Sequence, residues 1–366
     1  MKKNVNVAVL PGDGIGEEVM TVCSSLLTQF SNHSTDYCLN FQQLEAGANC
    51  YLRTGEALPA EVLQTSRNAD AILLGAMGLP SIRYEDGTEI APQLDLRFEM
   101  NLFAGVRPVK PLAGLPLPLA NRDDREIDFV LVRESTEGLF ASHGKGEVIE
   151  DRVATDTMRI TRPVSESLFN FSFDLAMDRK KSGYAGKLTC VDKANVFASM
   201  AFFRKIYDQV GVDFPDVDKE HMYVDAAALN MVKQPWNMDV LVTENMFGDI
   251  LSDLGAGLMG GMGMAPSADI GDDHAVFQPC HGTAPDIIGQ GKANPTAMLL
   301  SGAMMMIWLG KRQNLPTMVE DGRTLEAAVE TAFATGKLLP YELGGSSGTE
   351  AIYAAVLQAL ETNHIE

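Results

Sequence analysis

Residues 5–16 read VNVAVLPGDGIG, a β-branched and apolar run that ends in a glycine-rich turn. Residues 5–10 predict a buried strand, because the run is short, continuous and closed by Pro11 and Gly12. Apolar residues then recur at helical spacing over residues 18–30, which predicts a helix directly after the turn. The strand pattern returns strongly at residues 71–74, 128–132 and 240–243, and more weakly at 188–191 and 222–224. Strands that alternate with helical segments favour an α/β fold with a largely parallel sheet.

The chain of 366 residues carries a formal net charge of −20. Its length suggests two domains, or one large α/β unit with an insertion. A strongly negative field repels nucleic acid and anionic lipid surfaces, so we expect neither as a partner. The same field repels small anions, so an anionic ligand must be met by a local cluster of arginines or by a metal.

Five scattered cysteines contain no C-x-x-C pair, which argues against a disulfide scaffold and against a structural zinc site. The apolar run at residues 5–10 is too short for the core of a signal peptide. The longest apolar stretch, residues 297–309, falls short of the roughly 20 residues that cross a bilayer. We therefore expect a cytoplasmic protein without a membrane span.

The turn Gly12-Asp13-Gly14-Ile15-Gly16 is similar to a dinucleotide-binding fingerprint. Its spacing is G-x-G-x-G rather than G-x-G-x-x-G, and Asp13 stands where a pyrophosphate would lie. A tight strand-to-helix turn is the favoured interpretation, and dinucleotide binding at this turn is the alternative.

Asp249 and Asp253 lie four residues apart in the stretch NMFGDILSDL (residues 245–254). On a helix they share one face, where their carboxylates repel each other. Their apolar neighbours suggest a mostly buried helix, so the two charges need a compensating group. Mg²⁺ or Mn²⁺ suits such carboxylate ligands, and a solvated acidic face is the alternative.

Three arginines, Arg97, Arg107 and Arg133, could together bind carboxylates, because a guanidinium group forms two parallel hydrogen bonds with a carboxylate. Taken singly, each is more readily a surface ion pair. Lys193 follows a β-rich run within VDKANV (residues 191–196) and has apolar neighbours. A partly desolvated lysine shifts its pKa and can act as an acid or base, whereas the alternative is an ordinary loop lysine.

The segment HGTAPD (residues 281–286), followed by Asn294 and Pro295, predicts a rigid loop that exposes polar side chains. A carboxylate such as Asp286 could bind a ribose diol of NAD and would repel the 2′-phosphate of NADP. A purely structural turn is the alternative.

In their combination and order, these motifs resemble those of the β-decarboxylating dehydrogenases, which act on isopropylmalate, isocitrate, homoisocitrate, tartrate or D-malate. The resemblance runs from residues 12–16 to residues 344–345 and is most specific around residues 245–254 and 281–295. It implies a two-domain α/β fold with a mixed sheet, not a Rossmann fold. A large cofactor-binding domain would comprise residues 1–99 and 252–366. A small domain, residues 100–251, would carry substrate, metal and dimer-interface residues.

The resemblance also implies a homodimer in which each active site is shared between subunits. Asp249 and Asp253 would hold Mg²⁺ or Mn²⁺ together with Asp225 of the partner subunit. Lys193, also of the partner subunit, would transfer protons. The residues expected to bind the substrate are Gln93, Arg97, Arg107 and Arg133. The residues expected to bind NAD are His281, Gly282, Thr283, Ala284, Asp286 and Asn294.

The chain departs from the family pattern at the position of a proton donor. Family members usually have a tyrosine seven residues after the arginine that matches Arg133, and this chain has Phe140 there. Phenylalanine has no hydroxyl and cannot deliver a proton. We expect Ser142, His143 or a water to replace it, and otherwise decarboxylation is slow or the substrate does not need it.

Two further departures concern the substrate and the cofactor loop. Isopropylmalate enzymes place two apolar residues where this chain has Gln93 and Leu94, so we expect a more polar substituent at C3 of the substrate. Gln278 replaces the glutamate that is usual three residues before the histidine matching His281.

The leading hypothesis is therefore NAD- and metal-dependent oxidative decarboxylation of a small 2-hydroxy-3-carboxy acid of the 3-isopropylmalate type. Isocitrate, homoisocitrate, tartrate and D-malate are the alternative substrates. A second hypothesis is an oxidoreductase that stops at the keto acid, because Phe140 replaces the tyrosine. A third is a non-catalytic, ligand-binding regulatory subunit, which the presence of the lysine and all three aspartates disfavours.

Overall fold

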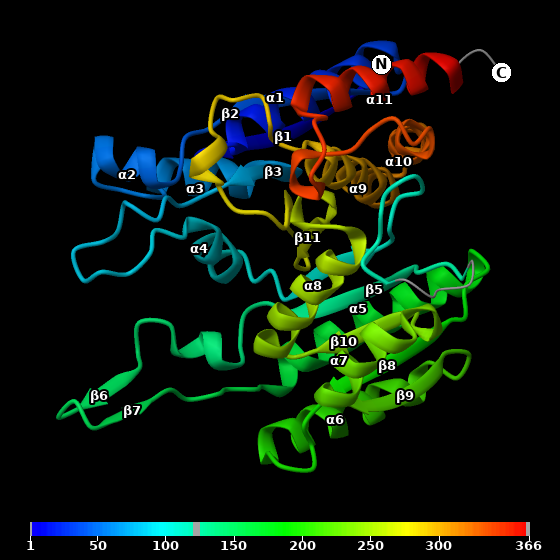
Figure 1. The fold of residues 1–366 in the computed structure, drawn as a ribbon. Helices are drawn as coiled ribbons and strands as arrows, with labels where there is room; N and C mark the ends of the chain where they lie inside the picture. Colours follow the sequence, from blue (N-terminus) through cyan, green and yellow to red (C-terminus); the bar gives the residue numbers. More distant parts are fainter. Residues whose placement is uncertain (1, 120–124, 364–366) are drawn as a thin grey trace.

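The computed structural model describes residues 2–119 and 125–363. Its centre is one ten-stranded mixed sheet that extends through both halves of the molecule (Figure 1). From edge to edge the strands are β2 (Tyr37–Gln43), β1 (Lys3–Gly12), β3 (Ala71–Ala76), β12 (Ala275–Pro279), β11 (Pro266–Ile270), β4 (Ala104–Val109), β5 (Phe129–Glu134), β10 (Val240–Thr243), β8 (Lys187–Asp192) and β9 (Asp218–Tyr223).

The sheet contains two parallel blocks joined by antiparallel strands. β2, β1, β3 and β12 are mutually parallel, as are β5, β10, β8 and β9. Between them, β11 is antiparallel to both of its neighbours and β4 is antiparallel to β5. The expected α/β class with a mixed sheet is confirmed. The strands predicted from apolar runs are all present, whereas β2, β4, β11 and β12 of this sheet were not predicted. β4 and β11 each contain a proline and a charged residue.

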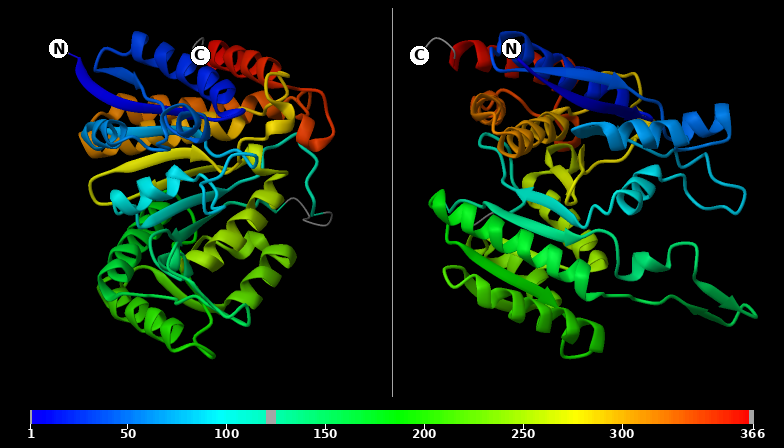
Figure 2. Two further views of the ribbon diagram at one scale, coloured as in Figure 1. Left: turned by 90° about the vertical axis from the view of Figure 1, so that its left-hand side faces the viewer. Right: turned by 180° about the vertical axis from the view of Figure 1, so that it is seen from behind.

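Helices cover both faces of the first parallel block (Figure 2). α1 (Gly16–His33) and α9 (Thr296–Gln313) pack on one face, and α10 (Pro316–Ala334) and α11 (Thr349–Asn363) form an outer layer on them. α3 (Ala60–Asn68) and α4 (Pro92–Glu99) contribute to the core on the other face, near α2 (Ala48–Thr54). In the second block, α5 (Arg162–Lys181) packs on β8 and β10, and α6 (Ala198–Val210) packs on β8 and on α5. α8 (Asn245–Met259) packs on β4 and β5, with α7 (Val224–Lys233) beside it.

β1 shows why its sequence is apolar at nearly every position. Val7 and Val9 belong to the core that contains α1 and α9, whereas Ala8 and Leu10 belong to the core on the opposite face. A parallel strand covered on both sides has no solvated face, so the alternation of polar and apolar residues disappears. Each fully buried valine or leucine contributes about 1.5–3 kcal/mol to folding.

The glycine-rich turn after β1 is closed by the carboxylate of Asp13. This buried side chain accepts hydrogen bonds from the backbone N–H groups of Ala48 (2.7 Å), Asn49 (2.9 Å) and Gly78 (2.9 Å). It thereby links the turn to the start of α2 and to the loop after β3. An anion of the chain itself satisfies these donors, which supports the interpretation of a tight turn over a pyrophosphate site.

Replacing Asp13 with alanine is expected to lower the free energy of unfolding by about 2–4 kcal/mol, because three backbone N–H groups lose their acceptor. Urea denaturation of the two proteins measures the difference. The matched control is the exposed Asp272, for which the same substitution should change stability by no more than about 0.5 kcal/mol. Equal effects at the two positions would show that the carboxylate is not the link.

Helix α8 bears on the expected domain boundary. Helix α8 is continuous across residues 251 and 252, where the boundary is expected, so the division into 1–99 plus 252–366 and 100–251 stays a prediction. The two-stranded ribbon of β6 (Glu147–Ile149) and β7 (Val153–Thr155) projects from the second half of the molecule (Figure 1). Its Val148, Ile149 and Val153 side chains are exposed. Within the described ranges, no helix combines the length and apolarity needed to cross a membrane.

Candidate active site

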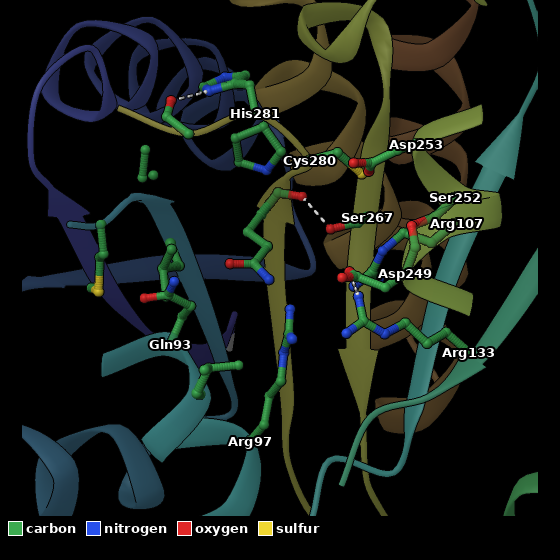
Figure 3. A pocket seen from close by; sticks show the side chains of 18 of the residues that line it. Gln93, Arg97, Arg107, Arg133, Asp249, Ser252, Asp253, Ser267, Cys280 and His281 are labelled. Atoms are coloured by element: carbon green, nitrogen blue, oxygen red, sulfur yellow. Dashed lines mark hydrogen bonds and ion pairs between the residues drawn. The ribbon is translucent and has the colours of Figure 1, made fainter. Parts of the chain in front are cut away.

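A pocket of about 250 Å³ lies where β3, α4, β4, β5, α8, β11 and β12 meet. It gathers side chains that are far apart in the sequence, and Figure 3 shows Gln93 across the pocket from Asp249 and Arg133. Of the residues expected to form the site, those that line the pocket are Gln93, Arg97, Arg107, Arg133, Phe140, Asp249, Asp253, His281 and Gly282.

Two of the three arginines are held by one buried carboxylate. The Nε of Arg97 and the Nη2 of Arg107 each lie 3.0 Å from an oxygen of Asp269 on β11. Burial alone would raise the pKa of Asp269, but Arg107 and Arg97 hold it down to about 2. The Nη1 of Arg107 also donates to the carbonyl of Ala268 (2.9 Å). These bonds fix both guanidinium groups before any ligand binds.

We expect these ion pairs to make the free energy of unfolding depend on pH in the acid range. The folded-state pKa of Asp269, about 2, lies below its ordinary value of 3.8, so the pairs stabilise the fold above that value. This stabilisation, on the order of 2 kcal/mol, is lost as the pH falls from about 4 to about 2. Urea unfolding at several pH values should show wild type and Asp269→Asn converging as the pH falls. A constant difference between them would contradict the expectation.

Arg133, at the end of β5, is held by the first turns of α8. Its Nε and Nη2 donate to the Oδ1 of Asn245 (2.9 and 2.7 Å), and its Nη1 pairs with Asp249. Burial, together with Arg97 and Arg107, lowers its pKa to about 10, so it stays charged at neutral pH. A Cβ at Gly248 would lie 2.6 Å from the Cγ of Arg133, so only glycine permits this close approach of helix and strand.

Asp249 and Asp253 lie one helical turn apart on α8 and both line the pocket, as expected. Burial and the neighbouring Asp249 raise the pKa of Asp253. A cation would relieve this repulsion, so the donor set fits a divalent metal. Among the described residues, no group of three or more histidine, cysteine, aspartate or glutamate side chains is placed to hold a metal. Two carboxylates of one chain therefore need further ligands.

Lys193 and Asp225 lie away from this pocket. The Nζ of Lys193, in the loop after β8, is 2.7 Å from the Oδ1 of Asp225 in the first turn of α7. The hydrogen bond from Lys193 lowers the pKa of the Asp225 carboxyl. Lys193 and Asp225 therefore contact each other but do not line the pocket with Asp249 and Asp253 of the same chain. The roles expected for Lys193 and Asp225 stay predictions.

The loop that follows β12 begins at the pocket and ends at the surface. His281 has its Nδ1 2.9 Å from the carbonyl of Gly282, and its buried Nε2 has no hydrogen-bond partner among the described residues. Burial lowers the pKa of His281. Thr283 is buried and its carbonyl accepts the N–H of Ile15 (3.0 Å), while a Cβ at Gly14 would lie 2.2 Å from the same oxygen.

The rest of the loop separates into exposed and buried residues. Ala284 adopts a left-handed conformation (φ 39°), and Asp286 follows it as an exposed residue of the 3₁₀ turn Pro285–Ile287. Asn294, in contrast, is buried: its amide donates to Glu342 (2.7 Å) and its Oδ1 accepts from Thr296. Cofactor contacts of this loop stay predictions, and Asn294 already has a structural role at the start of α9.

Phe140 and Gln93 both line the pocket. The guanidinium carbon of Arg133 lies 5.1 Å from the centre of the Phe140 ring. The Ser142 hydroxyl donates to the carbonyl of Thr157 and accepts from its N–H (2.8 Å each), and it lies outside the pocket lining, which argues against Ser142 as a substitute proton donor. His143 also lies outside that lining. The buried Oε1 of Gln93 has no partner among the described residues.

The model of the isocitrate/isopropylmalate dehydrogenase family matches residues 6–360.

The chain belongs to that family.

Named relatives and solved structures of similar length agree with this assignment. The 3-isopropylmalate/3-methylmalate dehydrogenase of Methanocaldococcus jannaschii is 40% identical over 344 residues, which are 94% of this chain and 95% of that protein. The 3-isopropylmalate dehydrogenase of Methanothermobacter thermautotrophicus is 39% identical, covering 98% and 99%. The crystal structure of isocitrate dehydrogenase from Methylococcus capsulatus superposes with a TM-score of 0.84 at 32% identity, covering 97% and 99%.

Sequence reasoning within this family did not single out Asp269 or Asn245 as parts of the site. Asn245 begins the α8 motif, and its Oδ1 accepts two hydrogen bonds from Arg133. Asp269 had a recognisable signal, a lone carboxylate inside the buried stretch Pro266–Ile270. A buried carboxylate requires a cationic partner, so the pattern could have pointed to the arginines.

Proposed function

We propose that the chain catalyses the NAD-dependent and Mg²⁺- or Mn²⁺-dependent oxidative decarboxylation of a 2-hydroxy-3-carboxy acid of the 3-isopropylmalate type. The observation that carries the proposal is a pocket in which three fixed guanidinium groups face two carboxylates on one turn of α8. The arginines match the carboxylates of such an acid, and the aspartate pair suits the cation. The named relatives point to the same class of substrate.

Each side chain takes one task in the proposed reaction. Arg97, Arg107 and Arg133 bind the substrate carboxylates and orient C2 and C3. Asp249 and Asp253 hold the divalent cation, which, when bound, polarises the hydroxyl and keto oxygens of the substrate. The loop at residues 281–286 would hold NAD, whose nicotinamide would supply the acceptor for the hydride of C2.

Proton transfer is assigned to Lys193 and Asp225 of the partner subunit. In its neutral form Lys193, whose Nζ lies 2.7 Å from the Asp225 carboxylate, would accept the proton of the C2 hydroxyl directly, through Asp225 or through a water. The C3 carboxylate then leaves as CO₂, its bonding electrons pass to the keto acid, and C3 takes up a proton. This arrangement requires a homodimer with shared sites. The exposed Ile250 on α8 and Leu229 and Val232 on α7 support an apolar contact between copies.

We also propose a cytoplasmic location. All five cysteines lie in the described ranges and are free, which suits a reducing compartment.

A substrate screen tests the proposed function. Purified protein is assayed with 3-isopropylmalate, isocitrate, homoisocitrate, tartrate and D-malate, with NAD⁺ or NADP⁺, and with Mn²⁺ or EDTA. We expect NADH and CO₂ to form together from one of these acids only when Mn²⁺ is present. Turnover of none of them by protein that still binds one would support the regulatory-subunit alternative instead.

Phe140 favours one alternative activity, oxidation that stops at the keto acid. Its ring replaces a hydroxyl that could protonate C3, and the nearby Ser142 hydroxyl is engaged by Thr157. The ratio of CO₂ to NADH in the same assay separates the two activities. One CO₂ for each NADH supports the leading proposal, whereas accumulation of the undecarboxylated keto acid supports the alternative.

The preference for NAD is expected to depend on Asp286. Its exposed carboxylate suits a ribose diol and repels a 2′-phosphate, so Asp286→Lys should lower the ratio of kcat/KM for NAD⁺ over NADP⁺ by about 100-fold or more. Steady-state kinetics with both cofactors measures the ratio. Asp273→Lys, at another exposed position, makes the same change in net charge and should leave the ratio unaltered. An equal shift in both variants would exclude a local role for Asp286.

A further inference from the structure

A second cavity, of about 260 Å³, lies on the opposite face of the sheet from the active-site pocket. Arg107 on β4 and Ser267 on β11 line the pocket, whereas their neighbours Pro108 and Pro266 line this cavity. Successive residues of a strand point to opposite faces, so the two hollows are separate. The lining of the cavity comes from both halves of the sheet, because α9 and α10 contribute to it together with β5 and α5.

The lining combines apolar side chains with two ion pairs. Lys110, in the segment after β4, pairs with Glu330 on α10. Arg179, on α5, lies 3.1 Å from the carboxylate of Asp128, which also accepts the hydroxyl of Tyr184 (2.9 Å). Both cations among the described lining residues are therefore already held by carboxylates. The apolar part of the lining includes Leu112, Val130, Met259, Leu300 and Met304.

A third carboxylate of the lining has no partner. Glu326, one helical turn before Glu330 on α10, makes no hydrogen bond or ion pair with any described residue. Burial raises the pKa of Glu326 to about 7; Lys110 and Arg323 oppose this shift, whereas Glu330 and Asp128 add to it. The ordinary pKa of the group is 4.5, so at neutral pH the fold holds an ionised Glu326 at a cost in stability. A cation from outside the chain would relieve that cost.

We propose that this cavity binds a small organic cation, a primary ammonium group on a short alkyl body. The ammonium group pairs with the carboxylate of Glu326, and the alkyl body packs on the apolar side chains of the lining. A metal ion is a poorer match, because the described residues contain no group of three or more potential metal ligands. The site does not depend on the proposed reaction, since the cavity and the active-site pocket share no lining residue.

Calorimetric titration of the full chain tests the site, with 3-methylbutylammonium chloride as the probe and the uncharged 3-methylbutan-1-ol as its match in shape. Glu326→Gln removes the carboxylate, and Met304→Phe reduces the space for the alkyl body. The matched control is Glu320→Gln, at an exposed position of the same helix. Asp249→Asn is a second control, because the carboxylates of α8 could also attract a cation. Circular dichroism and thermal unfolding report whether each variant is folded.

We expect wild type at pH 8 to bind the ammonium probe with a Kd on the order of 1 mM. Glu326→Gln should weaken this binding about tenfold or more, because a hydrogen bond to a charged group is lost, and the alcohol should bind wild type more weakly by a similar factor. Met304→Phe should also weaken binding of the probe, since the alkyl body loses its space. Glu320→Gln and Asp249→Asn should bind the probe as wild type does.

The affinity should also depend on pH. The probe pairs with the ionised form of Glu326, whose pKa is about 7, and its own ammonium group stays charged at neutral pH. The ionised fraction of such a carboxyl falls about tenfold from pH 8 to pH 6, so binding should weaken about tenfold over that range. Glu326→Gln should show no such dependence.

Three results would overturn the proposal. The first is the absence of saturable binding to wild type up to about 10 mM, ten times the expected Kd. The second is an equal effect of Glu326→Gln and Glu320→Gln, which would show that only the net charge matters. The third is loss of binding in Asp249→Asn but not in Glu326→Gln, which would place the cation at α8. None of these measurements uses turnover, so a failure of the proposed function leaves the test intact.

Discussion

Mixed dimers that combine a Lys193→Met subunit with an Asp253→Asn subunit are expected to recover about half of the wild-type activity, although each variant alone is nearly inactive. Lys193 and Asp225 lie apart from the pocket that Asp249 and Asp253 line, so a site shared across subunits takes one pair from each chain. One site of the mixed dimer then carries both substitutions and the other carries neither. Lys193→Met should lose about 10²–10⁴-fold in kcat, the usual range for a group that transfers protons. Asp253→Asn removes a proposed ligand of the cation and should lower kcat on the order of 10³-fold.

Co-expression with two different affinity tags isolates the mixed dimers, and a spectrophotometric assay of NADH formation measures them. The matched control is a mixed dimer of Lys193→Met with Asp225→Asn. These two residues belong to the same half of each shared site, so both sites remain damaged and no activity should return. If every active site lay within one subunit, both mixed dimers would be equally inactive, and the shared-site proposal would fail.

The loss of the cation is expected to abolish turnover. Burial, and after it the neighbouring Asp249, raises the pKa of Asp253, and the proposed cation would both relieve this repulsion and polarise the substrate. Treatment with EDTA should stop the reaction and Mn²⁺ should restore it. Asp249→Asn should lower kcat/KM on the order of 10³-fold, since the cation contributes several kcal/mol to the transition state.

Direct titration of Mn²⁺ provides a second measurement that does not depend on activity. Asp249→Asn should bind Mn²⁺ much more weakly than wild type, whereas Asp273→Asn, which removes an exposed carboxylate elsewhere, should bind it normally. Turnover that persists in EDTA would exclude the metal. Normal Mn²⁺ affinity in Asp249→Asn would place the cation at other ligands.

The sequence predicted those parts of the fold in which local pattern and packing agree. β1, β3 and β10 are continuous apolar runs because both of their faces are covered, and α1 has the periodicity of a helix with one buried side. β4 and β11 lack such patterns. β11 contains Asp269, whose charge is compensated by arginines about 160 residues or more away in the chain. Local periodicity does not report a partner at that separation, so propensity alone could not place this strand.

The residues of the site also separate into those that the sequence predicted and those that it did not. The predicted arginines, the α8 aspartates and His281 do come together, because each belongs to a recognisable motif at the end of a strand or on a helix face. The supporting residues Asn245 and Asp269 were missed, since their role is to hold other side chains and not to present a motif. Lys193 does not line the pocket of its own chain, and only the resemblance to a family with shared sites suggested this in advance.

The contact between Gly14 and Thr283 has a consequence for exchanging cofactor specificity by transplanting loops. The turn near the start of the chain rests directly on the backbone of the loop near residue 283, with Ile15 bonded to the carbonyl of Thr283. A loop taken from another protein brings its own backbone conformation. It can pack against the turn only if the turn residue that contacts it has no side chain, as Gly14 has none. The turn and the loop should therefore be exchanged together. A chimaera that replaces residues 281–294 should also take residues 12–16 from the same donor protein.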